Sequence, residues 1–200
     1  EASRDRYNKI WDAFGICLKE GYYHSKDEWG DLLVSLFRFH TMNSEESELV
    51  SLVNYKAAMP EDQDAIYYLT GESRDSALKS PHVEGAKARG WDVLVLTDTV
   101  DEWLVGSLEE FDGVPLKSVA RGEFDTQEDD EDSDAEKVDI AELAPWMQTV
   151  YGDLVKSVRA SNRLTSSPCV LVDDEEGASS NMERIMRAAN QQMWEVSRHL

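Results

Sequence analysis

Basic residues are scarce in this sequence of 200 residues, which holds 20 Lys and Arg against 41 Asp and Glu and has a formal net charge of −21. Such an excess of negative charge repels the phosphates of nucleic acids and anionic lipid headgroups. The sequence has no run of eighteen apolar residues, so it predicts no segment that spans a bilayer. We therefore expect neither nucleic acid nor a membrane as a partner.

Cysteine and histidine are too few and too scattered to predict a metal site. Cys17 and Cys169 lie far apart and form no Cys-x-x-Cys pair, and the four histidines form no His-Glu-x-x-His motif. Unpaired cysteines are typical of a reducing compartment, which favours a cytoplasmic location. Gly-x-Ser-x-Gly, Gly-x-Gly-x-x-Gly and phosphate-loop motifs are also lacking, so no catalytic residue is predicted.

The negative charge is concentrated in one stretch. Residues 123–136 hold nine acidic residues, no basic residue and one aromatic residue, whereas residues 137–200 have a net charge of only −2. A segment of that composition cannot bury a core. We therefore predict an acidic linker at 123–136 between two folded segments, 1–122 and 137–200.

The first sixty residues carry apolar side chains at helical spacing. The period predicts a coil of three helices, with Gly21 ending the first and Pro60 ending the third.

Residues 61–122 change to strand-like periods. Residues 66–70 and 93–97 are short β-rich runs, and 116–119 is a third. Helices are predicted between them, from Ser73 to Arg89 and from Thr99 to Phe111. This order predicts a small, mainly parallel three-layer α/β/α unit.

After the linker, a separate small α+β segment is predicted. It contains a helix at 140–151, two strands at 155–164 and 169–172, and a final helix opened by a capping box at Ser180. The fold class is thus α/β, or α+β over the whole chain. Because the chain starts without Met and ends within a helical pattern, we expect it to be part of a longer protein.

Three carboxylates cluster after the buried strand at 93–97. Asp98, Asp101 and Glu102 stand where α/β enzymes often place an active site. A helix start also favours acidic residues through its dipole. A stand-alone acidic α/β enzyme or an interaction scaffold using this cluster therefore remains an alternative.

Two apolar features could bind other proteins. Trp103 lies in the first turn of a predicted helix, where a tryptophan is either packed in the core or an exposed anchor. An apolar stripe at helical spacing consists of Met182, Ile185, Met186, Ala189 and Met193. Methionine adapts to many partners, although ordinary core packing explains the same pattern.

Several segments occur together in a specific order. They are Leu36-Phe37-Arg38-Phe39, Thr70-Gly71-Glu72-Ser73, Ser80-Pro81-His82-Val83-Glu84, Asp101-Glu102-Trp103, Ser161-Asn162-Arg163-Leu164 and Asn181-Met182-Glu183-Arg184-Ile185-Met186. This ordered set resembles the heat shock protein 90 chaperone family, of the HtpG type. The resemblance runs over nearly the whole chain except the acidic stretch.

The resemblance implies where this chain belongs in a larger chaperone. Residues 1–122 look like the later part of the family's middle domain, and residues 137–200 look like the start of its C-terminal dimerisation domain. The family's ATP and Mg site would lie outside this chain. The full protein would be a homodimer, with co-chaperones possible, and a mitochondrial or plastid paralogue would look similar in this region.

The resemblance also implies residues that contact unfolded or partly folded client proteins. By similarity to HtpG-like members, these are Glu102 and Trp103 at the start of one helix, and Met182, Ile185, Met186 and Ala189 on another. The chain is thus expected to supply client contact and coupling between domains.

Overall fold

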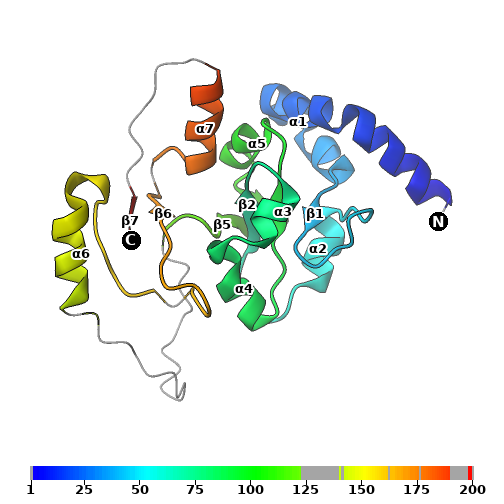
Figure 1. Ribbon diagram of the computed structural model, residues 1–200. Helices are drawn as coiled ribbons and strands as arrows, with labels where there is room; N and C mark the ends of the chain where they lie inside the picture. Colours follow the sequence, from blue (N-terminus) through cyan, green and yellow to red (C-terminus); the bar gives the residue numbers. More distant parts are fainter. Residues whose placement is uncertain are drawn as a thin grey trace. The chain divides into compact units, whose positions relative to one another are not determined.

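The computed structural model describes residues 2–122, 140, 142–161, 163–175, 177–189 and 198–199 (Figure 1). The chain divides into two compact units, each described separately below. The first comprises Glu1–Lys79 and Arg89–Ser118, and the second comprises Ser80–Ala88 and Val119–Leu200. The predicted acidic linker at 123–136 lies outside the described residues.

The first unit is built on a five-stranded mixed sheet in the order β1-β3-β2-β5-β4. Its strands are β1 (His40–Thr41), β2 (Ile66–Thr70), β3 (Leu94–Leu96), β4 (Glu110–Phe111) and β5 (Val114–Ser118). The central strand β2 pairs in parallel with β3 and β5, and the two edge strands are antiparallel to their neighbours. The mixed α/β fold class is confirmed, and the antiparallel edges are an addition to it.

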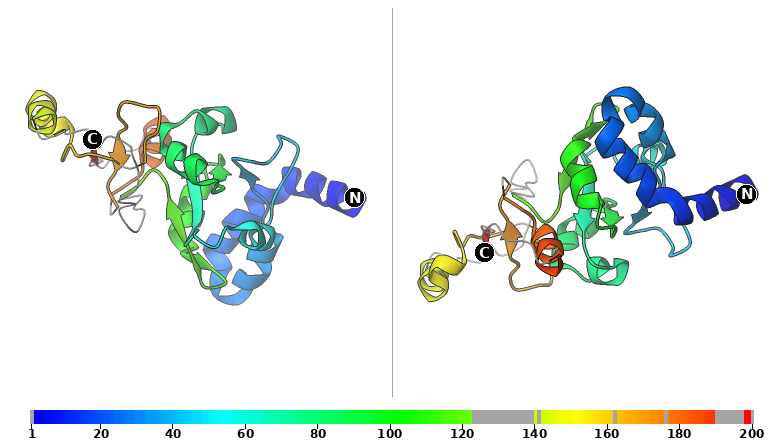
Figure 2. Two further views of the ribbon diagram at one scale, coloured as in Figure 1. Left: turned by 90° about the horizontal axis from the view of Figure 1, so that it is seen from below. Right: turned by 90° about the horizontal axis from the view of Figure 1, so that it is seen from above.

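Helices pack around this sheet. They are α1 (Ala2–Leu36), α2 (Leu52–Ala58), α3 (Arg74–Leu78) and α5 (Asp101–Ser107). The chain leaves helical geometry inside α1 at Ser25 (φ −135°, ψ 26°), so the first helix continues to this residue, four beyond its predicted end at Gly21. The Tyr7 hydroxyl donates to the carbonyl of Leu36 at 2.6 Å, which joins the two parts of α1. The first turns of α1 project beyond the rest of this unit (Figure 2).

Two predicted helix boundaries in this region are wrong. The helix predicted from Thr99 to Phe111 ends at Ser107, and Val100 caps it without a side-chain hydrogen bond. Residues 110–118 instead form a hairpin, because Asp112 (φ 50°) and Gly113 (φ 75°) both take the left-handed conformation that a tight two-residue turn requires.

The predicted helix from Ser73 to Arg89 is broken. Ser73 does begin it, through a capping box with Ser76. Because Pro81 cannot donate a backbone hydrogen bond, the helix ends before it. A 3-10 turn (Pro81–Val83) and α4 (Glu84–Arg89) follow.

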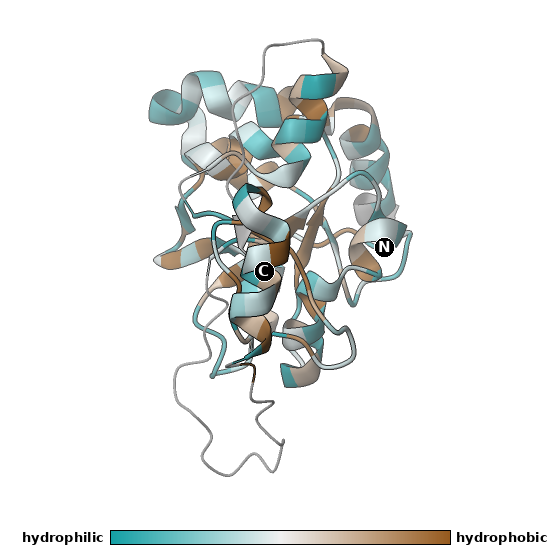
Figure 3. Cartoon of the chain, turned by 60° about the vertical axis from the view of Figure 1, so that its left-hand side comes forward, coloured by the Kyte–Doolittle hydropathy of each residue, from teal (hydrophilic) through white to brown (hydrophobic). Residues whose placement is uncertain are grey.

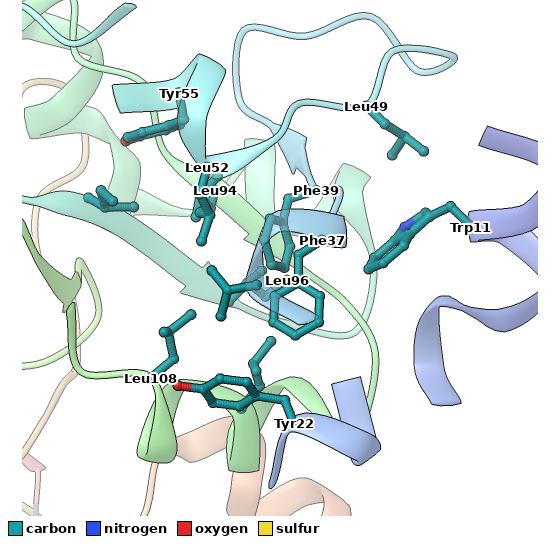
Figure 4. Close-up of a cluster of buried hydrophobic side chains, with 13 residues drawn as sticks. Trp11, Tyr22, Phe37, Phe39, Leu49, Leu52, Tyr55, Leu94, Leu96 and Leu108 are labelled. Carbon is teal, nitrogen blue, oxygen red and sulfur yellow. The ribbon is translucent and has the colours of Figure 1, made fainter. Parts of the chain in front are cut away.

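The core of the first unit is rich in aromatic rings (Figure 4). Its fully buried members include Phe37, whose ring centroid lies 5.8 Å from that of Tyr22 and 6.0 Å from that of Phe39, in edge-on contacts. Such pairs add about 0.5–1.5 kcal/mol each to the stabilisation from burial alone. These contacts pack α1 against the residues that lead from it into β1.

The second unit contains, besides residues 80–88, the elements α6 (Leu143–Tyr151), a 3-10 turn (Gly152–Leu154), β6 (Val172–Asp173), α7 (Ser180–Ala188) and β7 (Arg198–His199). Strands β6 and β7 pair antiparallel. The strand predicted at 155–164 is wrong, since the described residues there form no strand. The cap of α7 is Ser179, one residue before the predicted Ser180, and its hydroxyl accepts from the Met182 amide at 2.9 Å.

Candidate functional site

The carboxylates that follow β3 are joined to a lysine of α1. Lys19 Nζ lies 2.7 Å from Asp98 Oδ2 and 2.7 Å from Asp101 Oδ1. The amide of Asp98 donates to Asp101 Oδ2 at 2.9 Å, which closes the turn that begins α5. The structure thus brings together two of the three predicted carboxylates and adds a cation that the sequence did not indicate.

The Lys19–Asp101 pair of this cluster is buried, whereas the Asp98 side chain is 37% exposed. Asp101 is 1% exposed, and Lys19 is buried with its Nζ 5.2 Å from the ring centroid of Phe39 and 5.8 Å from that of Trp11. Burial raises the pKa of Asp101, and the Lys19 charge opposes that rise. Removing one partner of such a pair leaves an uncompensated buried charge. The cluster therefore fastens α1 to the β3–α5 turn, which explains these carboxylates without catalysis.

Glu102 and Trp103 follow on the first turn of α5 but have different environments. Glu102 is 7% exposed, whereas Trp103 is 36% exposed. The next residue, Leu104, is buried in the aromatic core and fixes the rotation of the helix. Trp103 consequently presents an indole ring to the surface from a rigidly held helix.

The methionine stripe lies on and just after α7 of the second unit, and its last predicted member, Met193, is outside the described residues. Met182, Ile185 and Met186 are half-buried and Ala189 is exposed. Two contacts fix the start of this helix besides the Ser179 cap. The Asp173 carboxylate accepts from the amide of Ser180 at 2.7 Å and from its hydroxyl at 2.5 Å.

Asp173 also belongs to a backbone junction. Its amide donates to the carbonyl of Ala120 at 3.0 Å, and its carbonyl accepts from the amide of Gly122 at 3.2 Å. The segment that leaves β5 therefore pairs with β6, and the Asp173 side chain connects that pairing to α7. No motif or spacing in the sequence indicates this role for Asp173.

Two of the segments that carry the family resemblance are linked in the second unit. The Glu84 carboxylate accepts hydrogen bonds from the backbone of Thr165, Ser166 and Ser167 at 2.8, 2.9 and 3.2 Å. These bonds, first that from Ser166, hold the pKa of Glu84 well below its usual range. The contact joins the Ser80–Glu84 motif to the residues that follow the Ser161–Leu164 motif. The presence of both motifs in the sequence was the signal that could have pointed to this contact.

Arg163 is buried beside this contact. Its guanidinium donates to the carbonyls of Val119 at 2.9 Å and Gly122 at 2.5 Å, and lies 3.5 Å from His82 Nδ1. Burial lowers the pKa of Arg163 to about 10. Burial and the Arg163 charge together lower the pKa of His82 to about 4, so His82 is neutral at physiological pH.

One apolar surface was missed by the sequence analysis. Helix α6 has no buried residue and carries no charged one, and Leu143, Trp146 and Val150 are exposed on one face. In the hydropathy view, hydrophobic residues recur along this helix, which comes forward in that orientation (Figure 3). Their spacing of three and four residues was the available signal.

Within the described parts of the chain, no group of three or more His, Cys, Asp and Glu side chains is arranged to hold a metal ion. None of the helices in those parts combines the length and apolarity needed to cross a bilayer.

Comparison with known proteins gives a consistent result over almost the whole chain. The family model described as Hsp90 protein matches residues 1–199. The chaperone protein HtpG of Mycolicibacterium paratuberculosis is 44% identical over 191 residues, which cover 94% of this chain and 29% of that protein. HtpG of Aromatoleum aromaticum is 42% identical over 200 residues, covering 96% of this chain and 30% of that protein. The chain thus spans less than a third of the length of these curated relatives.

A solved structure also matches. It is the middle domain of a putative heat shock protein of Plasmodium falciparum, with a TM-score of 0.54 and 33% sequence identity. The match covers 57% of this chain and 47% of that one.

Proposed function

The chain belongs to the Hsp90 protein family, and on that premise we propose that it is part of an ATP-dependent molecular chaperone that binds partly folded client proteins. In this proposal the chain supplies client contact and coupling between domains. Residues 1–122 are the later part of the middle domain, 123–136 a linker, and 137–200 the start of the C-terminal domain.

The observation that carries the client-contact proposal is the exposure of Trp103. A tryptophan that is 36% exposed on a helix anchored by buried Leu104 offers a large apolar ring at little conformational cost. Tryptophan is enriched among the residues that dominate binding energies at protein interfaces. Glu102 is buried, so in our proposal the direct contact with a client falls to Trp103.

A second client-contact surface is proposed on α7. Its half-buried Met182, Ile185 and Met186 and its exposed Ala189 present flexible thioethers and small apolar groups. Methionine side chains repack around different partners, as a protein that binds many sequences requires. The Ser179 cap and the Asp173–Ser180 contact hold this surface in place.

The remaining properties follow from family membership and stay proposals. ATP and Mg would be bound by another part of the full protein, and we assign no residue of this chain to them. ATP binding would bias the arrangement of domains and hence the affinity for clients, which is a coupling free energy between sites. We further propose a homodimer in the cytoplasm, with co-chaperones as possible partners.

The experiment that tests client contact is a titration of this chain against a labelled protein held unfolded, such as reduced and carboxymethylated α-lactalbumin, followed by fluorescence anisotropy. The proposal predicts saturable binding of the unfolded form and none of the native, disulfide-bonded form. Absence of binding, or equal binding of both forms, would contradict it.

A further inference from the structure

The Glu84 carboxylate sits in a cradle formed by three consecutive residues, Thr165, Ser166 and Ser167. Besides the three backbone amides that donate to Oε2, the hydroxyls of Ser166 and Ser167 donate to Oε1 at 2.9 and 2.5 Å. Both carboxylate oxygens are therefore engaged. Hydrogen bonds to an ionised acceptor are about twice as strong as neutral ones. We call this set of contacts the Glu84 clamp.

The segment that carries Glu84 is connected at both of its ends to the first unit. Segment 80–88 belongs to the second compact unit, but the residues on both sides of it, up to Lys79 and from Arg89, belong to the first. The chain therefore passes between the units after residue 79, after residue 88 and again after residue 118. Whatever holds segment 80–88 onto the second unit ties that unit to the first at two more points of the chain.

Arg163 reinforces the same attachment at the third passage. It donates to the carbonyls of Val119 and Gly122, the residues by which the chain enters the second unit after β5, and it lies beside His82 of segment 80–88. One buried guanidinium thus bridges the two stretches of chain that arrive from the first unit. The Glu84 clamp begins two residues farther along each segment, at Glu84 after His82 and at Thr165 after Arg163.

We propose that the Glu84 clamp is the device by which movement is passed between the two units of the chain, with Glu84 acting as a positioning residue. This inference rests on the proposed function, since it assigns the coupling role named there to particular residues. With the clamp closed, segment 80–88 moves with the second unit, and the two units are joined by three passages of chain. With the clamp open, segment 80–88 loses its bonds to residues 165–167 and keeps the contact between His82 and Arg163, so it follows the second unit less closely.

The two native cysteines allow a direct test in the 200-residue chain. Cys17 lies in the first unit and Cys169 in the second, and both are free and exposed. Nitroxide spin labels attached to them report the distribution of distances between the units by pulsed electron paramagnetic resonance. Hydrogen exchange of the amides of residues 165–167 reports the clamp itself.

The variant Glu84→Gln keeps the shape of the side chain but removes its charge and replaces one acceptor by a donor. We expect exchange of the 165–167 amides to become roughly tenfold faster, together with a broader distribution of distances between the labels. Asp75→Asn is the matched control, because it neutralises an exposed carboxylate that pairs with Lys79 one helical turn away. The control is expected to change neither readout.

A second, milder variant keeps the test valid if Glu84→Gln fails to fold. Ser166→Ala with Ser167→Ala removes the two hydroxyl bonds and leaves the three backbone bonds, so both readouts should change in the same direction by a smaller amount. Faster exchange with an unchanged distance distribution would overturn the coupling role. Unchanged exchange in Glu84→Gln would overturn the clamp. In either case the client titration, which uses Trp103 and α7, still tests the proposed function separately.

Discussion

Lys19 and Asp101, 82 residues apart in the sequence, form an ion pair of 2.7 Å in the interior of the first unit. Asp98 shares the same ammonium group. Because Asp101 is almost fully buried, its charge is compensated chiefly by Lys19. The start of the helix that carries Trp103 is therefore fixed by a residue of α1.

Replacing Lys19 by methionine should destabilise the first unit by about 3–5 kcal/mol, the cost of leaving a buried charge without its partner. Urea denaturation measures this change. The additional substitution Asp101→Asn should recover part of the loss, since it removes the uncompensated charge. Lys79→Met, which breaks an exposed pair with Asp75, should change stability by less than about 1 kcal/mol. Equal effects of the two lysine substitutions would contradict this account of the cluster.

His82 should make the second unit less stable as the pH falls. Its pKa is about 4 in the folded chain against an ordinary 6.5. Below about pH 6.5 the unfolded chain takes up a proton that the folded chain does not, so the free energy of unfolding decreases until the pH reaches about 4. His82→Gln should reduce the difference between urea midpoints at about pH 7 and about pH 5.

The control for that measurement is His24→Gln, at an exposed histidine of α1. It should leave the difference between the two midpoints as in the parent chain. A His82→Gln chain with the parent's full pH dependence would show that another group is responsible.

Gly106 of α5 is a site where a side chain should stabilise the fold. A Cβ built there meets nothing within 4 Å, and the backbone is not in the left-handed region. Gly106→Ala should raise the free energy of unfolding by about 0.5–1 kcal/mol, because alanine loses less backbone entropy in a helix. Thermal unfolding followed by circular dichroism measures the change.

Gly113 provides the opposite case. It also has open space around its Cβ position, but its φ of +75° is unfavourable for any residue with a side chain. Gly113→Ala is therefore expected to destabilise the hairpin. If Gly106→Ala and Gly113→Ala both raised or both lowered the free energy of unfolding, this account of their backbone conformations would be contradicted.

The sequence was sufficient for the parts of the fold that depend on local pattern. The strands β2 and β3 are continuous apolar runs, and the parallel arrangement follows from the helices between them. It was insufficient at the helix ends. Thr99 looked like a cap, but the turn that begins α5 is closed by Asp101, whose position is set by Lys19 from a distant helix.

For the candidate site too, local sequence pattern predicted which helices carry the residues but not how each residue is buried. Helical spacing identified the apolar stripe of α7, and the position of Trp103 in a first turn singled out α5. The sequence could not tell that Glu102 would be buried and Trp103 exposed, because this depends on how Leu104 packs into the core. The sequence did not indicate that other segments are held in place by Glu84, Arg163 and Asp173. Their partners are either far away in the sequence or in backbone segments of irregular structure, where periodicity carries no information.

The central claim is that Trp103 and the α7 surface contact clients. The most direct measurement is the affinity of the chain for labelled, permanently unfolded α-lactalbumin, compared with that of the double variant Trp103→Ala, Met186→Ala. The account predicts at least a tenfold loss, roughly the effect of removing one interface residue worth about 1.4 kcal/mol. Trp29→Ala, at an exposed tryptophan of α1, should bind like the parent chain. Equal affinities of the double variant and the parent chain would contradict the assignment.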